Sequence, residues 1–441
     1  MNDPRTTGGE GPLERRFGLL TATGVVAASM IGTGVFTTTG LLSAQLEGGG
    51  TVLLAWLLGG LFALCGALAY GELAASISRN GGEYRFLAEA YHPAVGFAAG
   101  FISLVVGFSA PTAASAVAFG KYLEALVPGL PASASAVVLI LGLAALHTAR
   151  VKVGAAVQDL FVVVKIGLIL VFLVGAAFLL PAQPVGDLTL SGEALLGSPF
   201  AVGLIFVAFA YSGWNGAAYL AGEVREPART LPLALLLGTG LVTLLYLGLN
   251  LVFLLGLEPA ALKGTVEVGH LAAVSLFGEA AGRLLSTGIA LALVSSVSAL
   301  LMVGPRVYEA MGEDHRPLRF LRLRPDGGGP AASIVLQAAL ALVLVLTLSF
   351  DALLMYIGFT LSLSAALTVA GVFVLRRRQP DLPRPYRTWG YPLTPLLFVG
   401  FALWMIVWSV GQRPREALLG VATIVVGLLL HALLARGGRA R

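Results

Sequence analysis

The chain has 441 residues, of which 57% are hydrophobic and only 12% are Asp, Glu, Lys or Arg. Soluble domains carry about 25% charged residues, so this composition excludes a soluble enzyme, and its apolar content excludes a disordered chain. The net charge of +5 is interpreted as a membrane-orientation signal rather than a nucleic-acid-binding one. We therefore predict an all-α polytopic membrane protein.

Apolar stretches recur along the whole chain, separated by charged or Pro- and Gly-rich segments. Each is about twenty residues long, the length that crosses a hydrocarbon core of ~30 Å. The pattern predicts twelve transmembrane helices, at 18–43, 51–76, 93–120, 132–148, 154–180, 199–222, 231–256, 282–306, 331–349, 351–375, 391–411 and 415–435.

The basic residues give this arrangement an orientation. With the N-terminus inside, 22 of the 28 basic residues fall in cytoplasmic segments, five fall outside and Lys165 lies within a helix. Lys and Arg collect in cytoplasmic loops, which predicts a multi-pass protein of the plasma (inner) membrane with cytoplasmic tails at 1–17 and 436–441. The single cysteine, Cys65, excludes a disulfide within the chain.

Two apolar stretches are interrupted near their centres. In the first, Gly32 and Gly34 flank Thr33, which favours either close helix packing or an unwound segment whose free amides bind an anion. In the sixth, residues 211–215 (Tyr-Ser-Gly-Trp-Asn) follow the first break by 180 residues. Corresponding interrupted helices in two halves predict an inverted-repeat transporter with a site near the midplane.

Two further polar features lie at similar depth. Lys165 lies in the middle of the fifth stretch, where an ammonium costs about 2.5–3.5 kcal/mol or more, and it is interpreted either as a structural cap or as a coupling residue. Ser295, Ser296 and Ser298 lie in the eighth stretch. They are either packing residues or oxygen ligands for a cation.

The sequence lacks the motifs typical of ATP-driven transporters, metal-binding proteins and enzymes. No phosphate-binding Gly-x-x-x-x-Gly-Lys-[Ser/Thr] motif occurs, which argues against ATP as an energy source. The five histidines lie on different segments without the spacing of metal ligands, and no catalytic cluster is present. We therefore predict that the protein is not an enzyme and has no cofactor or metal. Glu72 and Asp159 are expected to be solvated at helix ends.

The sequence resembles the amino acid–polyamine–organocation transporter superfamily, and within it the L-type amino-acid transporters and related bacterial permeases. The resemblance covers nearly the whole chain. It rests on residues 29–36, 70–73 with 80–84, 151–158 with Lys165, 209–215 with 222–227, and 384–387 with 390–392.

This resemblance implies a LeuT-like fold with discontinuous helices 1 and 6. The first repeat of five helices spans 18–180, an inverted second repeat spans 199–378, and two peripheral helices follow at 391–435. It also implies that the substrate carboxylate meets the amides of the first break and that its ammonium meets helix-end carbonyls. The implied substrate-binding residues are Ile31, Gly32, Thr33, Gly34, Phe209, Ala210, Ser212, Gly213 and Asn215, with Phe209 as an aromatic lid.

By the same resemblance, the Lys165 ammonium occupies the place of a sodium ion, beside Ser295 and Ser296. We therefore expect a sodium-independent secondary transporter of amino acids that works by alternating access, either proton-coupled or as an exchanger. No acidic residue lies at mid-depth among the helices expected to line the site, so a cationic side chain would lack a counter-charge, which favours neutral L-amino acids. The alternative is a cationic amino-acid or polyamine antiporter. A partner subunit is left open.

Overall fold

A computed structural model of the protein describes residues 17–149, 151–180, 185–192, 195, 197–324 and 330–439, with the side chains of 151–162 and 436–439 left out. The described residues are helical apart from turns, loops and one bridge between Phe17 and Val224. The predicted tails, 1–17 and 436–441, fall almost entirely outside the described residues and side chains. The all-α fold class is confirmed.

Nine helices among the described residues are long and apolar enough to cross a membrane. Two of these spans combine shorter elements: Leu19–Gln45 holds α1 and α2, and Pro93–Leu126 holds α5 (Pro93–Ile102), the π-helix η1 (Ser103–Ser109) and α6 (Ala110–Leu126). The other seven are α3 (Gly49–Ser76), α7 (Ala132–Ala149), α10 (Pro227–Gly256), α13 (Glu279–Asp314), α15 (Phe350–Arg378), α16 (Leu393–Gln412) and α17 (Pro414–Arg439).

The three remaining predicted stretches fall on shorter apolar helices. They are the segment Val163–Leu179 of α8 (Val151–Leu179), α9 (Ser198–Ala210) and α14 (Ala331–Thr347). A polytopic membrane protein is thus confirmed, whereas twelve spans and the inverted repeats stay predictions.

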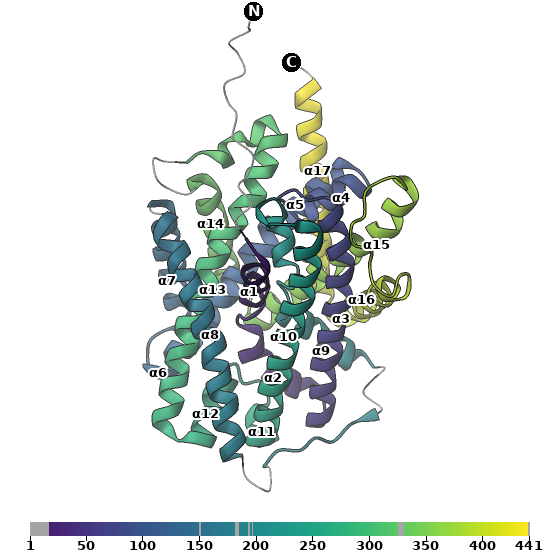
Figure 1. Cartoon of the computed structure of the whole chain (residues 1–441). Coiled ribbons are helices and arrows are strands. Elements are labelled where there is room, and N and C mark those ends of the chain that lie inside the picture. Colours follow the sequence, from purple (N-terminus) through teal and green to yellow (C-terminus); the bar gives the residue numbers. More distant parts are fainter. Residues whose placement is uncertain are drawn as a thin grey trace, which may run out of the picture.

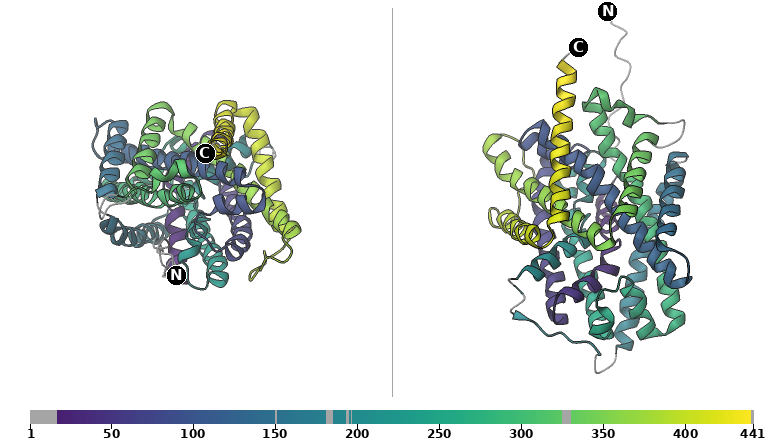
Figure 2. Two further views of the ribbon diagram at one scale, coloured as in Figure 1. Left: turned by 90° about the horizontal axis from the view of Figure 1, so that it is seen from above. Right: turned by 180° about the vertical axis from the view of Figure 1, so that it is seen from behind.

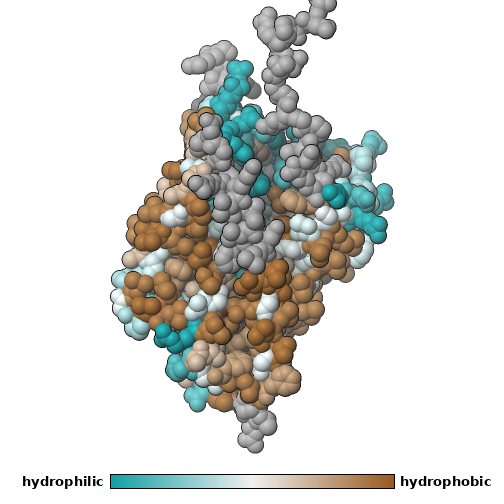
Figure 3. Space-filling view, turned by 60° about the vertical axis from the view of Figure 1, so that its left-hand side comes forward, coloured by the Kyte–Doolittle hydropathy of each residue, from teal (hydrophilic) through white to brown (hydrophobic). Residues whose placement is uncertain are grey.

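Most of the long helices run along a common axis and leave short elements at both ends (Figure 1), whereas α16 lies across that axis (Figure 2). One end carries α4 (Glu83–Ala90) and the end of α17; we call it the α4 face. The opposite end carries α11 (Pro259–Leu262) and α12 (Val268–Phe277), and we call it the α12 face. Helices α16 and α17 lie at the periphery (Figure 2). Hydrophobic side chains cover most of the visible flank in Figure 3, as a lipid-facing surface requires.

The first predicted stretch is broken where the sequence predicts. Helix α1 (Leu19–Met30) ends before Ile31, whose backbone is extended, and α2 (Gly34–Gln45) begins three residues later. The sixth stretch is broken as well, because α9 ends at Ala210 and a 3₁₀ helix, η3 (Gly216–Glu223), follows a turn. Gly213 in that turn has φ of +97°, a conformation that glycine adopts without steric cost. Both interruptions are confirmed.

The expectation that Glu72 is solvated is wrong. Its side chain is only 3% exposed and pairs with Arg376 at 2.7 Å and Arg384 at 3.6 Å. Its Oε2 also accepts hydrogen bonds from the backbone N–H and the hydroxyl of Thr388. The end of α3 is covered by α15 and the loop after it, so the carboxylate meets arginines rather than water. Asp159 lies outside the described side chains.

Three of the five histidines come together although they lie on different segments. The ring centre of His431 lies 6.5 Å from that of His92 and 5.8 Å from that of His315. Phe97 packs against His315 and His431. Burial lowers the pKa of His315 below its ordinary value, and the neighbouring His431 lowers it further. Among the described residues, no group of three or more His, Cys, Asp or Glu could hold a metal ion.

Candidate functional site

The two helix breaks lie in direct contact. A Cβ built on Gly34 would be 2.3 Å from the Cα of Ala210, and one built on Gly213 would be 2.5 Å from the carbonyl oxygen of Ser29. Only residues without a side chain allow this approach. The glycines therefore bring the end of α1, the start of α2 and the end of α9 to one point.

The positive end of one helix dipole and the negative ends of two others meet at this point. The amides of Thr33 and Gly34 lie at the start of α2, and neither donates to a backbone carbonyl within the described part of the chain. Such amides, with the positive end of the helix dipole, favour an anion. The last carbonyls of α1 and α9 lie nearby and favour a cation.

Some of these carbonyls already have partners. The Tyr246 hydroxyl donates to the Met30 carbonyl at 2.6 Å, and Lys165 Nζ donates to the Ile31 carbonyl at 3.2 Å. The amide of Ser212 donates to the Phe209 carbonyl at 2.8 Å. A carbonyl oxygen has a second lone pair, so these contacts fix the helix ends and leave acceptor capacity.

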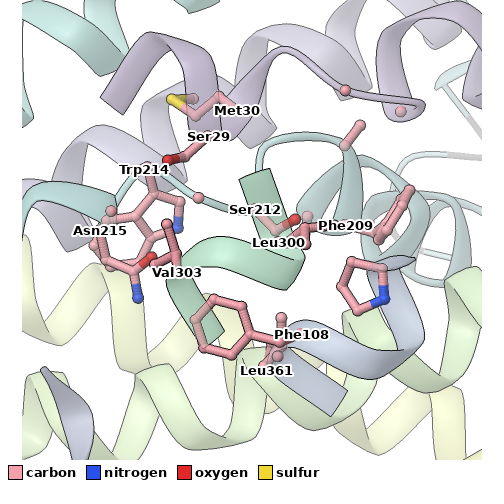
Figure 4. A pocket seen from close by; sticks show the side chains of 18 of the residues that line it. Ser29, Met30, Phe108, Phe209, Ser212, Trp214, Asn215, Leu300, Val303 and Leu361 are labelled. Carbon is pink, nitrogen blue, oxygen red and sulfur yellow. The ribbon is translucent and has the colours of Figure 1, made fainter. Parts of the chain in front are cut away.

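A cavity of about 170 Å³ lies at the contact between the breaks (Figure 4). In this view Phe209 and Asn215 lie on opposite sides of the space, and Phe108 faces them from below. Eight of the nine predicted substrate-binding residues line the cavity: Gly32, Thr33, Gly34, Phe209, Ala210, Ser212, Gly213 and Asn215. Ile31 is not among the lining residues.

The predicted coupling residues are only partly brought together. Lys165 is 2% exposed and donates to Ser296 Oγ at 2.8 Å as well as to the Ile31 carbonyl. Ser295 is buried, but its hydroxyl has no hydrogen-bond partner in the described structure. Ser296 lines the cavity, whereas Lys165 lies behind it.

The predicted helices carry no acidic residue at mid-depth, but the inference that the site lacks a counter-charge is wrong, because an acidic side chain reaches the cavity from α4, outside those helices. Glu83, the first residue of α4, is 4% exposed and is the one charged residue among those that line the cavity. Its carboxylate accepts hydrogen bonds from Tyr70, Asn215 and Ser364. The sequence signal was an acidic residue directly after a Gly-Gly pair, but it lies outside the predicted helices, so its depth was not apparent.

The cavity extends toward the α4 face and stops short of the α12 face. On α1 its lining continues back to Val25, whereas on α2 it ends at Gly34. Beyond that residue the Tyr122 hydroxyl donates to the Phe36 carbonyl at 3.0 Å, and the amide of Gly264 donates to the Gly40 carbonyl at 2.8 Å. The α12 face is therefore closed by packed helices in this conformation.

Comparison with known proteins agrees with this architecture. The sequence profile of the amino acid permease family matches residues 17–430. The chain belongs to the amino acid permease family.

Characterised relatives of this permease align over most of their own length. The large neutral amino acids transporter small subunit 2 of Oryctolagus cuniculus is 27% identical, covering 97% of this chain and 81% of that protein. The b(0,+)-type amino acid transporter 1 of Homo sapiens is 26% identical, covering 98% and 89%. The serine/threonine exchanger SteT of Bacillus subtilis (strain 168) is 29% identical, covering 89% and 91%.

Proposed function

We propose that this permease is a secondary transporter of amino acids, with neutral L-amino acids as its preferred substrates. The observation that carries the proposal is the cavity at the two touching helix breaks, which offers free amides on one side and helix-end carbonyls on the other. A zwitterionic amino acid carries the two complementary charges. Names of relatives that mention neutral amino acids or serine and threonine support the neutral class.

In this proposal the substrate carboxylate lies against the amides of Thr33 and Gly34. The ammonium is held by remaining lone pairs on the carbonyls at the ends of α1 and α9, with Ser212 beside them. Phe209 covers the substrate from the side of the α12 face, and Asn215 contacts its side chain. The lining of the cavity and the polarity of helix ends support these roles.

The proposed cycle is alternating access across the plasma membrane. The cavity of this conformation extends toward the α4 face, and the excess of basic residues in the segments of that face supports its assignment as cytoplasmic. Both termini are then cytoplasmic. The conformation corresponds to an inward-facing state with the outer side closed.

Sodium has no role in this proposal. The Lys165 ammonium bonds to the Ile31 carbonyl and Ser296 Oγ, oxygens that would otherwise be available to a cation between α1 and α13. An ammonium at this point repels a sodium ion. The transport is therefore driven by protons or by exchange of internal for external amino acid.

The alternative is a transporter of cationic amino acids or polyamines. It is favoured by one observation, the Glu83 carboxylate in the cavity wall. Glu83 is, however, already held by three uncharged donors, which leaves it less free to bind a substrate ammonium than an unpartnered carboxylate would be.

The test is uptake of labelled L-serine, L-leucine and L-arginine into proteoliposomes containing the purified full-length chain, with protein-free liposomes as the control. Uptake of serine or leucine without sodium is the expected result, and arginine competing better than either would favour the alternative. Accumulation driven by a pH gradient identifies proton symport, whereas dependence on internal amino acid identifies exchange. An absolute requirement for external sodium would overturn the proposed role of Lys165.

A further inference from the structure

Glu83 is a buried acid that the transport scheme above does not use. It comes from α4, outside the membrane-spanning helices, yet its side chain reaches the wall of the central cavity. Carboxylates at such depth are normally paired with a cation. Within the described part of the chain, the ion pairs formed by basic residues do not include Glu83.

The surroundings of Glu83 are polar but uncharged. Tyr70 donates from α3 at 2.5 Å, Asn215 from the turn after α9 at 3.2 Å, and Ser364 from α15 at 2.6 Å. These three groups belong to segments far apart in the sequence. The carboxylate therefore joins α3, α15 and the second helix break through one residue.

No positive charge in the described surroundings offsets this carboxylate. The helices packed against α4 are α5 and α15; α5 has no ionisable side chain, and α15 presents Ser364 and Thr368 at this level. The other ionisable groups facing Glu83 are the phenols of Tyr70 and Tyr219. Arg85, two residues further along α4, points instead to Asp314 and Glu313.

This environment favours the neutral acid. Burial raises the pKa of the Glu83 carboxyl above its ordinary value, even though its three hydrogen bonds lower it. The cavity extends toward the α4 face in the present conformation, so it offers a route by which water from that face can bring a proton to Glu83. When the cavity closes on that side, a proton on Glu83 is enclosed together with the substrate.

The geometry identifies which oxygen takes the proton. Oε1 accepts two hydrogen bonds, from Tyr70 and Asn215, whereas Oε2 accepts one, from Ser364. Oε2 has the greater free acceptor capacity, and the Ser364 hydroxyl can change from donor to acceptor. Protonation at Oε2 therefore leaves the two bonds to Oε1 intact.

We propose that Glu83 is a proton-binding site of the transport cycle, in which Oε2 takes a proton from cavity water and returns it to water when the cavity opens on the other side. The inference rests on the proposed transport function. Substrate and proton are linked through Asn215, which lines the cavity and bonds to Glu83. Protonation removes the one negative charge of the cavity wall while the cavity is enclosed.

The first test measures the initial rate of L-serine uptake by proteoliposomes between about pH 5 and about pH 8, a range that lies above the ordinary pKa of a glutamate carboxyl. The wild type is expected to change its rate at least about threefold across this range. Glu83→Gln keeps an acceptor for Tyr70 and Asn215 and a donor toward Ser364, so it mimics the protonated acid. It is expected to transport with a flat pH profile and to lose accumulation driven by a pH gradient.

Two further variants separate proton binding from a structural role. Glu89→Gln changes an exposed carboxylate on the same helix and is expected to keep the wild-type profile. Ser364→Ala removes a hydrogen bond that stabilises the Glu83 anion, so the inflection is expected to move to higher pH. A purely structural role for Glu83 predicts no such shift.

A measurement that does not depend on transport separates the proton site at Glu83 from the proposed transport function. The ring of Trp214 lies 4.7 Å from that of Tyr70, which bonds to Glu83. A pH titration of tryptophan fluorescence in detergent should show a transition that both Glu83→Gln and Trp214→Phe abolish.

If no amino acid is transported but the fluorescence transition depends on Glu83, the transport proposal fails and the proton site stands. Three outcomes overturn the proton site: a Glu83→Gln protein that keeps the wild-type pH profile, a wild type whose uptake does not depend on pH, and a fluorescence transition that is unchanged in Glu83→Gln.

Discussion

Gly34→Ala tests whether the contact between the two helix breaks is needed to form the substrate site. A Cβ at this position would lie 2.3 Å from Ala210 Cα and 2.5 Å from Ala210 Cβ, whereas ordinary contacts of a Cβ begin at 3.4 Å. Because one of these atoms is backbone, a rotamer change cannot relieve the clash. The breaks have to separate by about 1 Å, since packed interiors have few voids.

The expected effect is large on transport and modest on folding. Overpacking of this kind costs about 1–3 kcal/mol of stability, so the variant should still fold. A misplacement of about 1 Å in a positioned site reduces rates about 100-fold. Because Thr33 and Gly34 supply the proposed carboxylate site, the initial rate of L-serine uptake at low substrate concentration should fall about 100-fold.

The matched control is Gly24→Ala, the same substitution in α1 at a position where a Cβ meets nothing within 4 Å. This variant should transport normally and unfold at the same or a slightly higher temperature, because Ala is the better helix former. Both proteins are compared at equal incorporation, with size-exclusion profiles as the folding check. A Gly34→Ala protein that elutes and transports like the wild type would refute the reasoning.

Three other substitutions test separate parts of the structure. Lys165→Ala removes charge-assisted hydrogen bonds to the Ile31 carbonyl and Ser296, each worth about 1.5–3 kcal/mol, and should slow L-serine uptake at least about tenfold; rescue of this variant by external sodium would agree with an ammonium in the place of a cation, whereas unchanged uptake would contradict the proposal. Glu72→Gln leaves Arg376 without its buried partner and should lower the free energy of unfolding by about 3 kcal/mol, which a reduced thermal unfolding temperature would report. The pKa of Glu83 is raised in the folded state above the ordinary value of 4.5, so its stabilising contribution is complete below pH 4.5 and is lost as pH rises through the folded-state pKa. The unfolding temperature of the wild type should therefore fall with rising pH relative to that of Glu83→Gln, and parallel curves for the two proteins would contradict the raised pKa.

Features set by local sequence could be predicted. The helix breaks were recognisable because Gly32, Gly34 and Gly213 interrupt long apolar stretches, and a glycine in such a place weakens the helix whatever surrounds it. The burial of Lys165 followed in the same way, from its position in the middle of an apolar stretch.

Features set by long-range packing could not be predicted. Glu83 meets Ser364 across 281 positions of sequence, and Glu72 meets Arg376 across 304. Both carboxylates lie near helix ends, where the sequence pattern predicts water. Whether such a group is solvated depends on which distant segment covers it, and no local pattern carries that information.

The closed α12 face has a kinetic consequence. Its contacts are made largely by backbone: a Cβ on Gly40 would lie 1.9 Å from the carbonyl oxygen of Thr265, and the amide of Gly264 bonds to Gly40 itself. Side-chain rotations, which take picoseconds to nanoseconds, cannot open a barrier of this kind. Passage through this face requires α2 and the α11–α12 segment to move apart as whole elements, a motion of microseconds to milliseconds. The lifetime of the closed state on this side is thus set by helix displacement, and substitutions at Gly40 should change it without touching the substrate.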